Sequence, residues 1–441
     1  MSKKLPVVPA AVREEESARV AAMTLQPTLA LVDLQDAIRE GLMAFSCAAG
    51  MVVIAEMMEA ERTGIVGPRG KHDPHRTAER NGSVPGSVVL GGRRVPVNRP
   101  RAVSADGGGE IGLDTYAVFS STDLLTQVAM ERMLAGVATR RHGLVAEPIG
   151  AELERSARGD SKSAVSRRFK AATEAKLAEL IGADLSELDV AVLMIDGIMF
   201  AECCCVVALA VTTDGTKVPV GLWDGDTENT VVVKDLLADL VARGLRFEAG
   251  ILCVIDGSKA LAAGVKRVFG RHALIQRCTL HKRRNCADYL PPELGRATDR
   301  KLAKAFNDAD PARGLRVARG IATQLEAHHP SAAASLREGL EEMFTVRRLG
   351  VPDRLARSLS CTNAIESMIS VVQDLCGRVK NWKDARMVRR WVGVGMLEAQ
   401  RSFRRVKGCK DMPVLVAALR REVTRRVAED TTHPEPSHAV A

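Results

Sequence analysis

Residues 190–199 read Val-Ala-Val-Leu-Met-Ile-Asp-Gly-Ile-Met, and residues 250–257 read Gly-Ile-Leu-Cys-Val-Ile-Asp-Gly. Both runs are short, apolar, rich in β-branched residues and bounded by glycine, a pattern typical of strands buried within a sheet. Each run carries one carboxylate, Asp196 or Asp256. A carboxylate on a buried strand is costly unless it is protonated, paired or bound to a metal ion. The two runs therefore predict a central sheet and the place of its chemistry.

The segment around these runs predicts an α/β fold. Its pattern indicates strand, strand, strand, helix, strand, helix, strand, and Asp214-Gly215 is a hairpin turn signal between the second and third strands. A three-strand meander followed by alternating helices and strands matches the order of a ribonuclease-H-like mixed sheet. That order places Asp196 and Asp256 on adjacent strands. The expected elements are the Asp196 run, Cys203–Thr213, Lys217–Trp223, Thr230–Arg243, the Asp256 run, Lys259–Phe269 and Ala273–Cys278.

The rest of the chain is predominantly helical in pattern. We expect an N-terminal helical region with a small hairpin, a helix-turn-helix-like region, the first part of the catalytic core, an all-helical insertion, the second part of the core with basic helices, and a disordered polar tail. The N-terminal region is expected to hold a helix over 25–62, a Gly-, Pro- and His-containing stretch over 64–86 and a hairpin at Ser87–Val97 with a Gly-Gly turn. The boundaries of the six parts are 1–120, 121–185, 186–285, 286–357, 358–428 and 429–441.

Residues 121–185 predict a DNA-binding region. Asp123–Leu134 has a helical pattern, a second helix is expected to begin at Thr139, and a third begins near Ser161 or Ser163 as N-cap. Two short helices followed by a capped, arginine-rich helix suggest a helix-turn-helix. The alternative is a solvated basic helix face, and the residues alone leave both open. The DNA-contacting candidates are Arg140, Arg141, Arg167, Arg168 and Lys170.

Composition bounds the function. The 441 residues allow two or three domains, and 46% hydrophobic with 27% charged residues fits a soluble globular protein. A net charge of +9 is compatible with a polyanionic partner. The longest uninterrupted apolar run, Cys203–Val211, is too short to cross a bilayer, and the N-terminus shows no secretory signal, so we expect a cytoplasmic protein with no membrane partner. Aromatic residues at 3% argue against a stacking platform for single strands.

A third carboxylate, Glu366, completes the candidate site. Taken singly, each Asp-Gly pair also fits a strand that ends in a turn, and Glu366 also fits an ordinary helix carboxylate. As a set they suit two Mg²⁺ or Mn²⁺ ions, because hard oxygen ligands match hard cations. Such ions can activate a water or a 3′-hydroxyl and stabilise a leaving oxygen, so the set predicts phosphodiester chemistry.

Two further groups bear on this site. Cys278-Thr-Leu-His281 has a Cys-x-x-His spacing, but a structural zinc site needs about four ligands and no clear second pair stands nearby, which favours a supporting role for Cys278 and His281. His72 and His75 are interpreted as loop residues. Basic residues follow Glu366 densely, which favours contacts with DNA phosphates over a merely solvated surface. They are Arg378, Lys380, Lys383, Arg386, Arg389, Arg390, Arg401, Arg404 and Arg405.

Several segments together resemble the Mutator-type transposases of bacterial insertion sequences. The resemblance covers residues from about Arg80 to Lys410, and its most specific parts are Gln276-Arg-Cys-Thr-Leu-His-Lys-Arg-Arg-Asn285 and Cys361-Thr-Asn-Ala-Ile-Glu-Ser367. The other matching segments are Met194–Gly197, Val254–Leu261, Val379–Lys383 and Arg389–Trp391.

The resemblance implies an Asp-Asp-Glu transposase with a ribonuclease-H-like core, in which Asp196, Asp256 and Glu366 are the catalytic and metal-binding carboxylates. It also implies double-stranded DNA as partner, both the terminal inverted repeats of the element and the target, and a homodimer or larger assembly in the bacterial nucleoid. One alternative is a non-catalytic helix-turn-helix regulator. Another is a ribonuclease-H-like nuclease that hydrolyses DNA without joining it.

Overall fold

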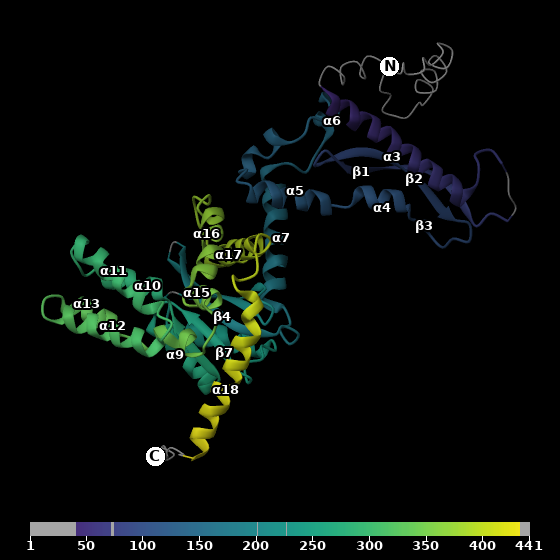
Figure 1. Cartoon of the computed structure of the whole chain (residues 1–441). Helices are drawn as coiled ribbons and strands as arrows, with labels where there is room; N and C mark the ends of the chain where they lie inside the picture. Colours follow the sequence, from purple (N-terminus) through teal and green to yellow (C-terminus); the bar gives the residue numbers. More distant parts are fainter. Residues whose placement is uncertain (1–40, 72–74, 201, 226, 433–441) are drawn as a thin grey trace, which may run out of the picture. The chain divides into compact units, whose positions relative to one another are not determined.

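The computed structural model describes residues 41–71, 75–200, 202–225 and 227–432, and the chain divides into two compact units, Met1–Ala172 and Thr173–Ala441 (Figure 1). The division falls inside helix α7 (Lys162–Gly182). The first part of the helix expected over 25–62 lies outside the described residues, and from Leu42 onward the chain forms helix α3 (Leu42–Val66). His72 lies outside the described residues. The expected tail is helical as far as Thr432, and its remainder also lies outside them.

The first unit is built on a long hairpin, β1 (Ala78–Leu90) and β2 (Arg93–Ser104), joined by Gly91 and Gly92, both with positive φ. The predicted Gly-Gly turn is confirmed, but β1 begins nine residues before the predicted Ser87. The first half of this strand has a polar, Gly- and Pro-containing sequence without the alternation that predicts a strand. The pairing of β1 with β2 also shifts register between Arg80 and Ser83. A two-residue strand, β3 (Glu110–Ile111), pairs with β2.

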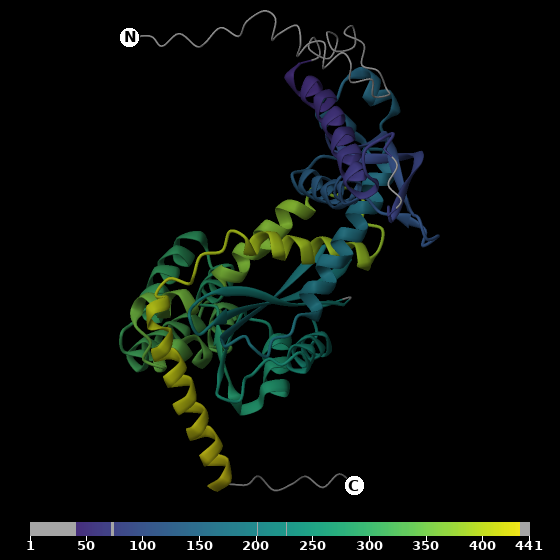
Figure 2. The same cartoon turned by 90° about the vertical axis from the view of Figure 1, so that its right-hand side faces the viewer.

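Helix α3 packs along this hairpin, and Figure 2 shows the two side by side. Ile54 and Met58 of α3 form a small core with Val88 and Leu113. The helix from Met43 to Val66 is also long and apolar enough to cross a membrane, by length and composition only. A helix that packs on the core of a folded domain passes the same test, so this feature is weak support for a membrane span.

The expected helix-turn-helix region is only partly helical. Helix α5 (Asp123–Leu134) matches its predicted bounds, and Ser161 caps α7 by accepting a hydrogen bond from the Ala164 amide at 3.3 Å. The helix expected from Thr139 is replaced by two 3₁₀ turns, Thr139–Arg141 and Gly143–Val145. Helices α4 (Asp114–Ser120) and α6 (Ala151–Ser156) complete the unit.

The second unit contains the predicted seven-element segment in the predicted order. Its five-stranded sheet has the order β6-β5-β4-β7-β8; β4 pairs antiparallel with β5 and parallel with β7. The Asp214-Gly215 hairpin is present, with Gly215 at φ +85°. The elements are β4 (Val190–Phe200), β5 (Cys203–Thr212), β6 (Lys217–Gly225), α8 (Thr230–Ala242), β7 (Ile251–Ile255), α9 (Lys259–Phe269) and β8 (Ala273–Arg277).

Helices cover both faces of the sheet. On one face, α8 and α9 pack on Leu193 and Ile195 of β4 and on the matching residues of its neighbours, which forms the main core. Because side chains alternate along a strand, Met194 and Asp196 point to the other face. There α16 (Asn363–Cys376) contacts β4, and α17 (Ala385–Gln400) contacts β5 and β6. Alternation therefore directs the Asp196 carboxylate toward the layer that contains Glu366.

Between α9 and α16 the chain is helical apart from β8, as predicted for the insertion. These helices gather beside α10 (Thr279–Ala287), green in Figure 1, around a core of their own that includes Phe306 and Phe344. Helices α11, α12 and α13 each begin with proline, which is favoured at a first helical position. The helices are α11 (Pro292–Phe306), α12 (Pro311–Glu326), α13 (Pro330–Arg337), α14 (Thr345–Arg348), α15 (Asp353–Leu359) and the C-terminal α18 (Met412–Thr432).

Candidate active site

Asp196 lies inside strand β4 and not at its end. The strand continues to Phe200, and Gly197 and Ile198 keep their pairing with Val206 and Cys205 of β5. The alternative of a strand-ending Asp-Gly turn is therefore wrong for this pair. The Gly197 amide donates a hydrogen bond to Asp196 Oδ1 at 2.9 Å, which fixes one carboxylate oxygen against the strand.

Asp256 follows the last residue of the neighbouring parallel strand. Ile195 and Ile255 are register partners in β4 and β7, so the two aspartates lie side by side, as their strand order predicts. The Ser258 amide donates to Asp256 Oδ1 at 2.7 Å, and the Ser258 hydroxyl accepts from the Leu261 amide as N-cap of α9. Here the aspartate does stand at the turn where a strand passes into a helix.

The two aspartates repel each other in a poorly hydrated place. Burial, reinforced by the negative charge of Asp256, raises the pKa of Asp196 to about 7. The Gly197 amide and the nearby His281 oppose this rise and do not cancel it. Within the described ranges, no lysine or arginine forms an ion pair with either aspartate. A cation bound between them would remove the repulsion.

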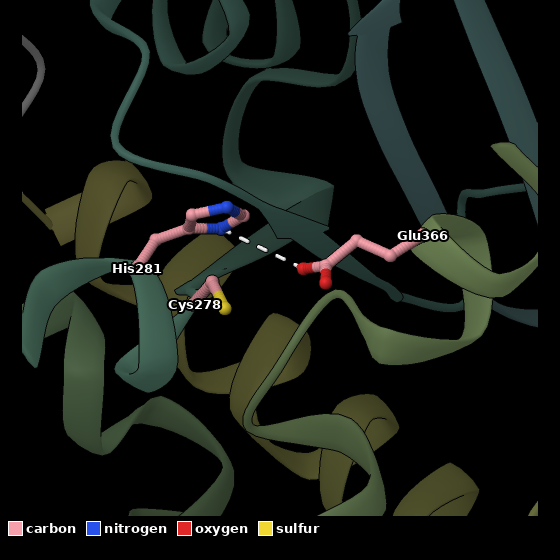
Figure 3. A group of neighbouring side chains, drawn as sticks. All are labelled: Cys278, His281 and Glu366. Carbon is pink, nitrogen blue, oxygen red and sulfur yellow. Dashed lines mark ion pairs between the residues drawn. The ribbon is translucent and has the colours of Figure 1, made fainter. Parts of the chain in front are cut away.

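Glu366 belongs to a second group, which it forms with Cys278 and His281. Ligand atoms of Cys278, His281 and Glu366 all lie within 4.8 Å of one another, and Figure 3 shows His281 Nδ1 facing the Glu366 carboxylate at 3.7 Å. Thr362 joins the three. Its amide donates to Cys278 Sγ at 3.4 Å, its hydroxyl donates to Glu366 Oε1, and His281 Nδ1 is 3.3 Å from its hydroxyl oxygen.

Local sequence explains how these residues meet. Cys278 directly follows β8 and stands at the N-cap position of α10, and His281 lies in the first turn of that helix. The amide and hydroxyl of Thr279 both donate to the Ser360 carbonyl at 3.0 Å, which holds the turn before α16 against the start of α10. Thr362 is the N-cap residue of α16, and Glu366 lies in its first turn. The predicted supporting role of Cys278 and His281 thus has a defined geometry.

Cys278 and His281 shift each other's pKa in opposite directions. Burial opposes ionisation of the Cys278 thiol, but hydrogen bonds from His281 and Thr362 outweigh it and lower the Cys278 pKa. The hydrogen bond with Cys278 is the largest influence on His281 and, together with the Glu366 and Asp196 charges, raises its pKa to about 9 despite burial. With its pKa raised to about 9, His281 carries a positive charge at neutral pH that interacts with both Glu366 and Asp196.

This charge state can be tested directly. In histidine-labelled protein, the NMR titration of the His281 ring should have its midpoint well above the ordinary histidine value near 6.5. In Cys278→Ala the midpoint should fall toward that value, because the strongest partner of the imidazolium is gone. His281→Gln assigns the signal. His272, which lies in the 3₁₀ turn directly before β8 and away from this group, is the internal control. An unshifted His281 midpoint in wild type would remove the ion-pair assignment.

Sequence reasoning missed one carboxylate, Glu228. It lies in the loop after β6, next to Asn229, whose side chain caps α8 by accepting from the Val231 and Val232 amides. Its neighbours are Gly197 on β4 and Ser258 before α9. The polar loop sequence gave no sign of this, because β5 separates β6 from β4 and only the folded loop crosses that distance.

The basic DNA-contact candidates differ in how far their side chains are exposed to solvent. Arg140, Arg141, Arg167, Lys170, Arg378, Lys380 and Lys383 are exposed. Three others are partly buried. Arg168 donates to the Gly159 carbonyl, Arg389 pairs with Asp224 at 3.1 Å, and Arg390 donates to the Thr173 hydroxyl at 3.2 Å.

The fold and site define an α/β protein with two partly buried aspartates at adjacent strands of its central sheet. A family model described as "Transposase, Mutator family" matches residues 24–405, and the chain belongs to that family, as its motifs predicted. It is 28% identical over 196 residues, 43% of this chain and 59% of the relative, to the transposase for insertion sequence element IS6120 of Mycolicibacterium smegmatis.

Two other relatives have similar names. The chain is 28% identical over 178 residues to the transposase for insertion sequence element IST2 of Acidithiobacillus ferrooxidans, covering 40% of this chain and 59% of the relative. A longer match, 23% identical over 323 residues, 72% of this chain and 78% of the relative, is with the transposase for insertion sequence element ISRM5 of Rhizobium meliloti. The first two matches span less than two thirds of those relatives.

Proposed function

We propose that this protein is a DNA transposase that binds the terminal inverted repeats of an insertion sequence and cleaves and transfers DNA strands through Asp196, Asp256 and Glu366. One observation carries the proposal. Asp196 in β4 and Asp256 directly after the neighbouring parallel strand β7 lie side by side, and burial together with the charge of Asp256 raises the pKa of Asp196. Among the described residues no lysine or arginine forms an ion pair with either aspartate. Two neighbouring carboxylates without a basic partner do not stabilise a protein fold, whereas a metal-dependent site requires such a pair.

The topology supports a ribonuclease-H-like core. An antiparallel β6-β5-β4 meander continues into the parallel strands β7 and β8, with helices on both faces. Asp196 at the middle strand and Asp256 beside it occupy the sheet position at which this fold would hold its first two carboxylates. Glu366 arrives on α16 after the helical insertion, on the face toward which Asp196 points.

The residues fit Mg²⁺ or Mn²⁺. The donor set consists of carboxylate oxygens, which hard divalent cations prefer, and the repulsion between Asp196 and Asp256 leaves negative charge to be neutralised. Asp196, Asp256 and Glu366 would hold two such ions, which when bound supply Lewis-acid activation at the scissile phosphate. The hydrogen bonds from the Gly197 and Ser258 amides orient the two aspartates, and Thr362 orients Glu366.

The remaining parts of the chain would bind and position DNA. We assign terminal-repeat binding to the helix-turn-helix-like region 121–185, and assign phosphate contacts to the exposed basic residues of that region and of the segment before α17. Joining two element ends calls for a homodimer or larger assembly on double-stranded DNA, in the bacterial cytoplasm. The non-catalytic regulator is a second candidate, favoured by the same basic residues, and it makes no use of Asp196, Asp256 and Glu366.

Purified full-length protein with Mn²⁺ and labelled DNA that carries the ends of its element tests the proposal. The expected products are nicked ends and strands joined to target DNA. Cleavage without joined products would instead identify a nuclease. End binding with no cleavage, in an assay where a control recombinase is active, would identify a regulator.

A further inference from the structure

Glu228 lies in the loop after the edge strand β6, yet its side chain reaches β4 at Gly197, the residue next to Asp196. Alternation along β4 turns Gly197 to the face opposite Asp196, and this is where Glu228 approaches. A Cβ placed on Gly197 would overlap Glu228 Oε2 and come within 3.3 Å of its Cδ. The half-buried Glu228 carboxylate therefore occupies the space that any side chain at position 197 would need.

Ser258 links Glu228 to Asp256. The Ser258 amide donates to Asp256 Oδ1 at 2.7 Å, and the Ser258 hydroxyl donates to the Glu228 carboxylate. One residue thus holds two carboxylates at the same turn. Asp196 and Glu228 in turn share Gly197, the first through its amide and the second through its missing side chain.

The arrangement gathers three carboxylates where charge is hard to solvate. Asp256 lies close enough to Asp196 and to Glu228 for electrostatic interaction with each, and Glu228 with Asp196. In the part of the chain that the structure describes, no lysine or arginine forms an ion pair with Glu228. A carboxylate that serves only to cap or tether a loop gains from a basic partner, whereas one that shares a divalent cation gains from other carboxylates.

We propose that Glu228 is a fourth carboxylate of this site and binds the divalent cation together with Asp196 and Asp256. The inference rests on the proposed metal-dependent function and deepens it. Glu228 approaches from the loop before α8, which packs on one face of the sheet, whereas Glu366 belongs to α16, which contacts β4 on the other face. Gly197 follows as a requirement of the site, since any larger residue would displace the Glu228 carboxylate.

Mn²⁺ affinity of the full-length protein without DNA tests this inference, with free Mn²⁺ measured by electron paramagnetic resonance. Glu228→Gln keeps the shape of the side chain and removes its charge, and we expect roughly 10- to 100-fold weaker binding. Glu187→Gln, an exposed glutamate before β4, is the matched control and should bind as wild type does. Asp256→Asn is the positive control for loss of the site.

Thermal unfolding separates a metal-binding role from a structural one. If Glu228 binds the cation, Glu228→Gln in EDTA should unfold at the wild-type temperature or above, because repulsion with Asp256 is relieved. Its stabilisation by added Mn²⁺ should be smaller than that of wild type. A variant that unfolds earlier in EDTA and keeps wild-type Mn²⁺ affinity would show a structural tether and overturn the inference.

The two proposals fail in different ways. If Asp256→Asn loses Mn²⁺ binding while Glu228→Gln binds as wild type does, only the role of Glu228 is wrong. If wild type binds no more Mn²⁺ than Asp256→Asn does, both the metal site and the role of Glu228 are wrong. If Glu228→Gln weakens Mn²⁺ binding but wild type neither cleaves nor joins element ends, the metal site stands and the transposase proposal does not.

Gly197→Ala checks the geometry independently. The added methyl group should displace the Glu228 carboxylate and weaken Mn²⁺ binding by about the same factor as Glu228→Gln. In a Glu228→Ala background the methyl group has room, so Gly197→Ala should there have little further effect on affinity. Additive losses in the double variant would show that Gly197 and Glu228 act separately.

Discussion

Asp256→Asn should abolish strand cleavage and strand transfer on element ends, with a fall in rate of about 1,000-fold or more, equivalent to about 4 kcal/mol of transition-state stabilisation. Asparagine keeps the size of the side chain and can still accept the Ser258 amide hydrogen bond at this position. What it removes is the negative charge next to Asp196. The loss should therefore be confined to chemistry and metal binding.

DNA-end binding provides the control for that prediction. Asp256→Asn should bind labelled ends as tightly as wild type, because the basic residues that are assigned to phosphate contacts lie on other elements. Asp235→Asn, a change of the same kind on α8 within the same unit, should cleave and join normally. Wild-type rates in Asp256→Asn would contradict the Asp-Asp-Glu assignment and favour the non-catalytic regulator.

Asp196 should make the metal-free protein lose stability as the pH rises. Its pKa is about 7 in the folded protein, above the ordinary value of 3.8 that applies when it is unfolded. Protonated Asp196 thus stabilises the fold, a contribution that is complete below about pH 4 and is lost as the pH passes through 7. The full effect is about 2–4 kcal/mol between those limits.

Urea unfolding in EDTA at pH 5 and pH 8 measures this loss. All three tryptophans, Trp223, Trp382 and Trp391, belong to the Thr173–Ala441 unit, so their fluorescence reports on the unit that carries the site. Asp196→Asn should reduce the difference between the two pH values, because it removes the titrating group while His281 and other groups still titrate. Saturating Mn²⁺ should do the same in wild type, since it favours ionised Asp196. Equal pH dependence in wild type and Asp196→Asn would refute the raised pKa.

The strands of the core were predictable because their residues leave little choice. Val190–Ile195 and Ile251–Ile255 are apolar throughout and rich in β-branched side chains, which suits strands covered on both faces. Their order along the chain then fixed Asp196 and Asp256 as neighbours. The first part of strand β1, before Ser87, escaped prediction because Arg80-Asn-Gly82 and Pro85 interrupt any apolar alternation. Its pairing with β2 supplies the stability that propensity lacks.

The parts of the site that depend on tertiary packing were not predictable from pattern. Thr362 lies in one of the segments that carry the family resemblance, but nothing in that segment indicates that it contacts Cys278, His281 and Glu366 at once. Glu228 comes near Gly197 only because its loop crosses from the edge strand β6 toward β4. The spacing of residues along one helix or strand can be read from the sequence. Contacts between residues of separate loops depend on the packing of the whole unit.

The order of these residues along the chain also bears on synthesis at the ribosome. Chains grow from the N-terminus, and domains fold as they emerge. Asp196, Glu228 and Asp256 are made before α10–α15, and Glu366 is made after them, held by a threonine that docks on α10. A nascent chain that ends at Ser360 therefore has Asp196, Glu228 and Asp256 but not Glu366. Under the proposed function, cutting activity would be withheld until the helical segment has been translated and folded, which protects the nearby chromosome from an unfinished enzyme.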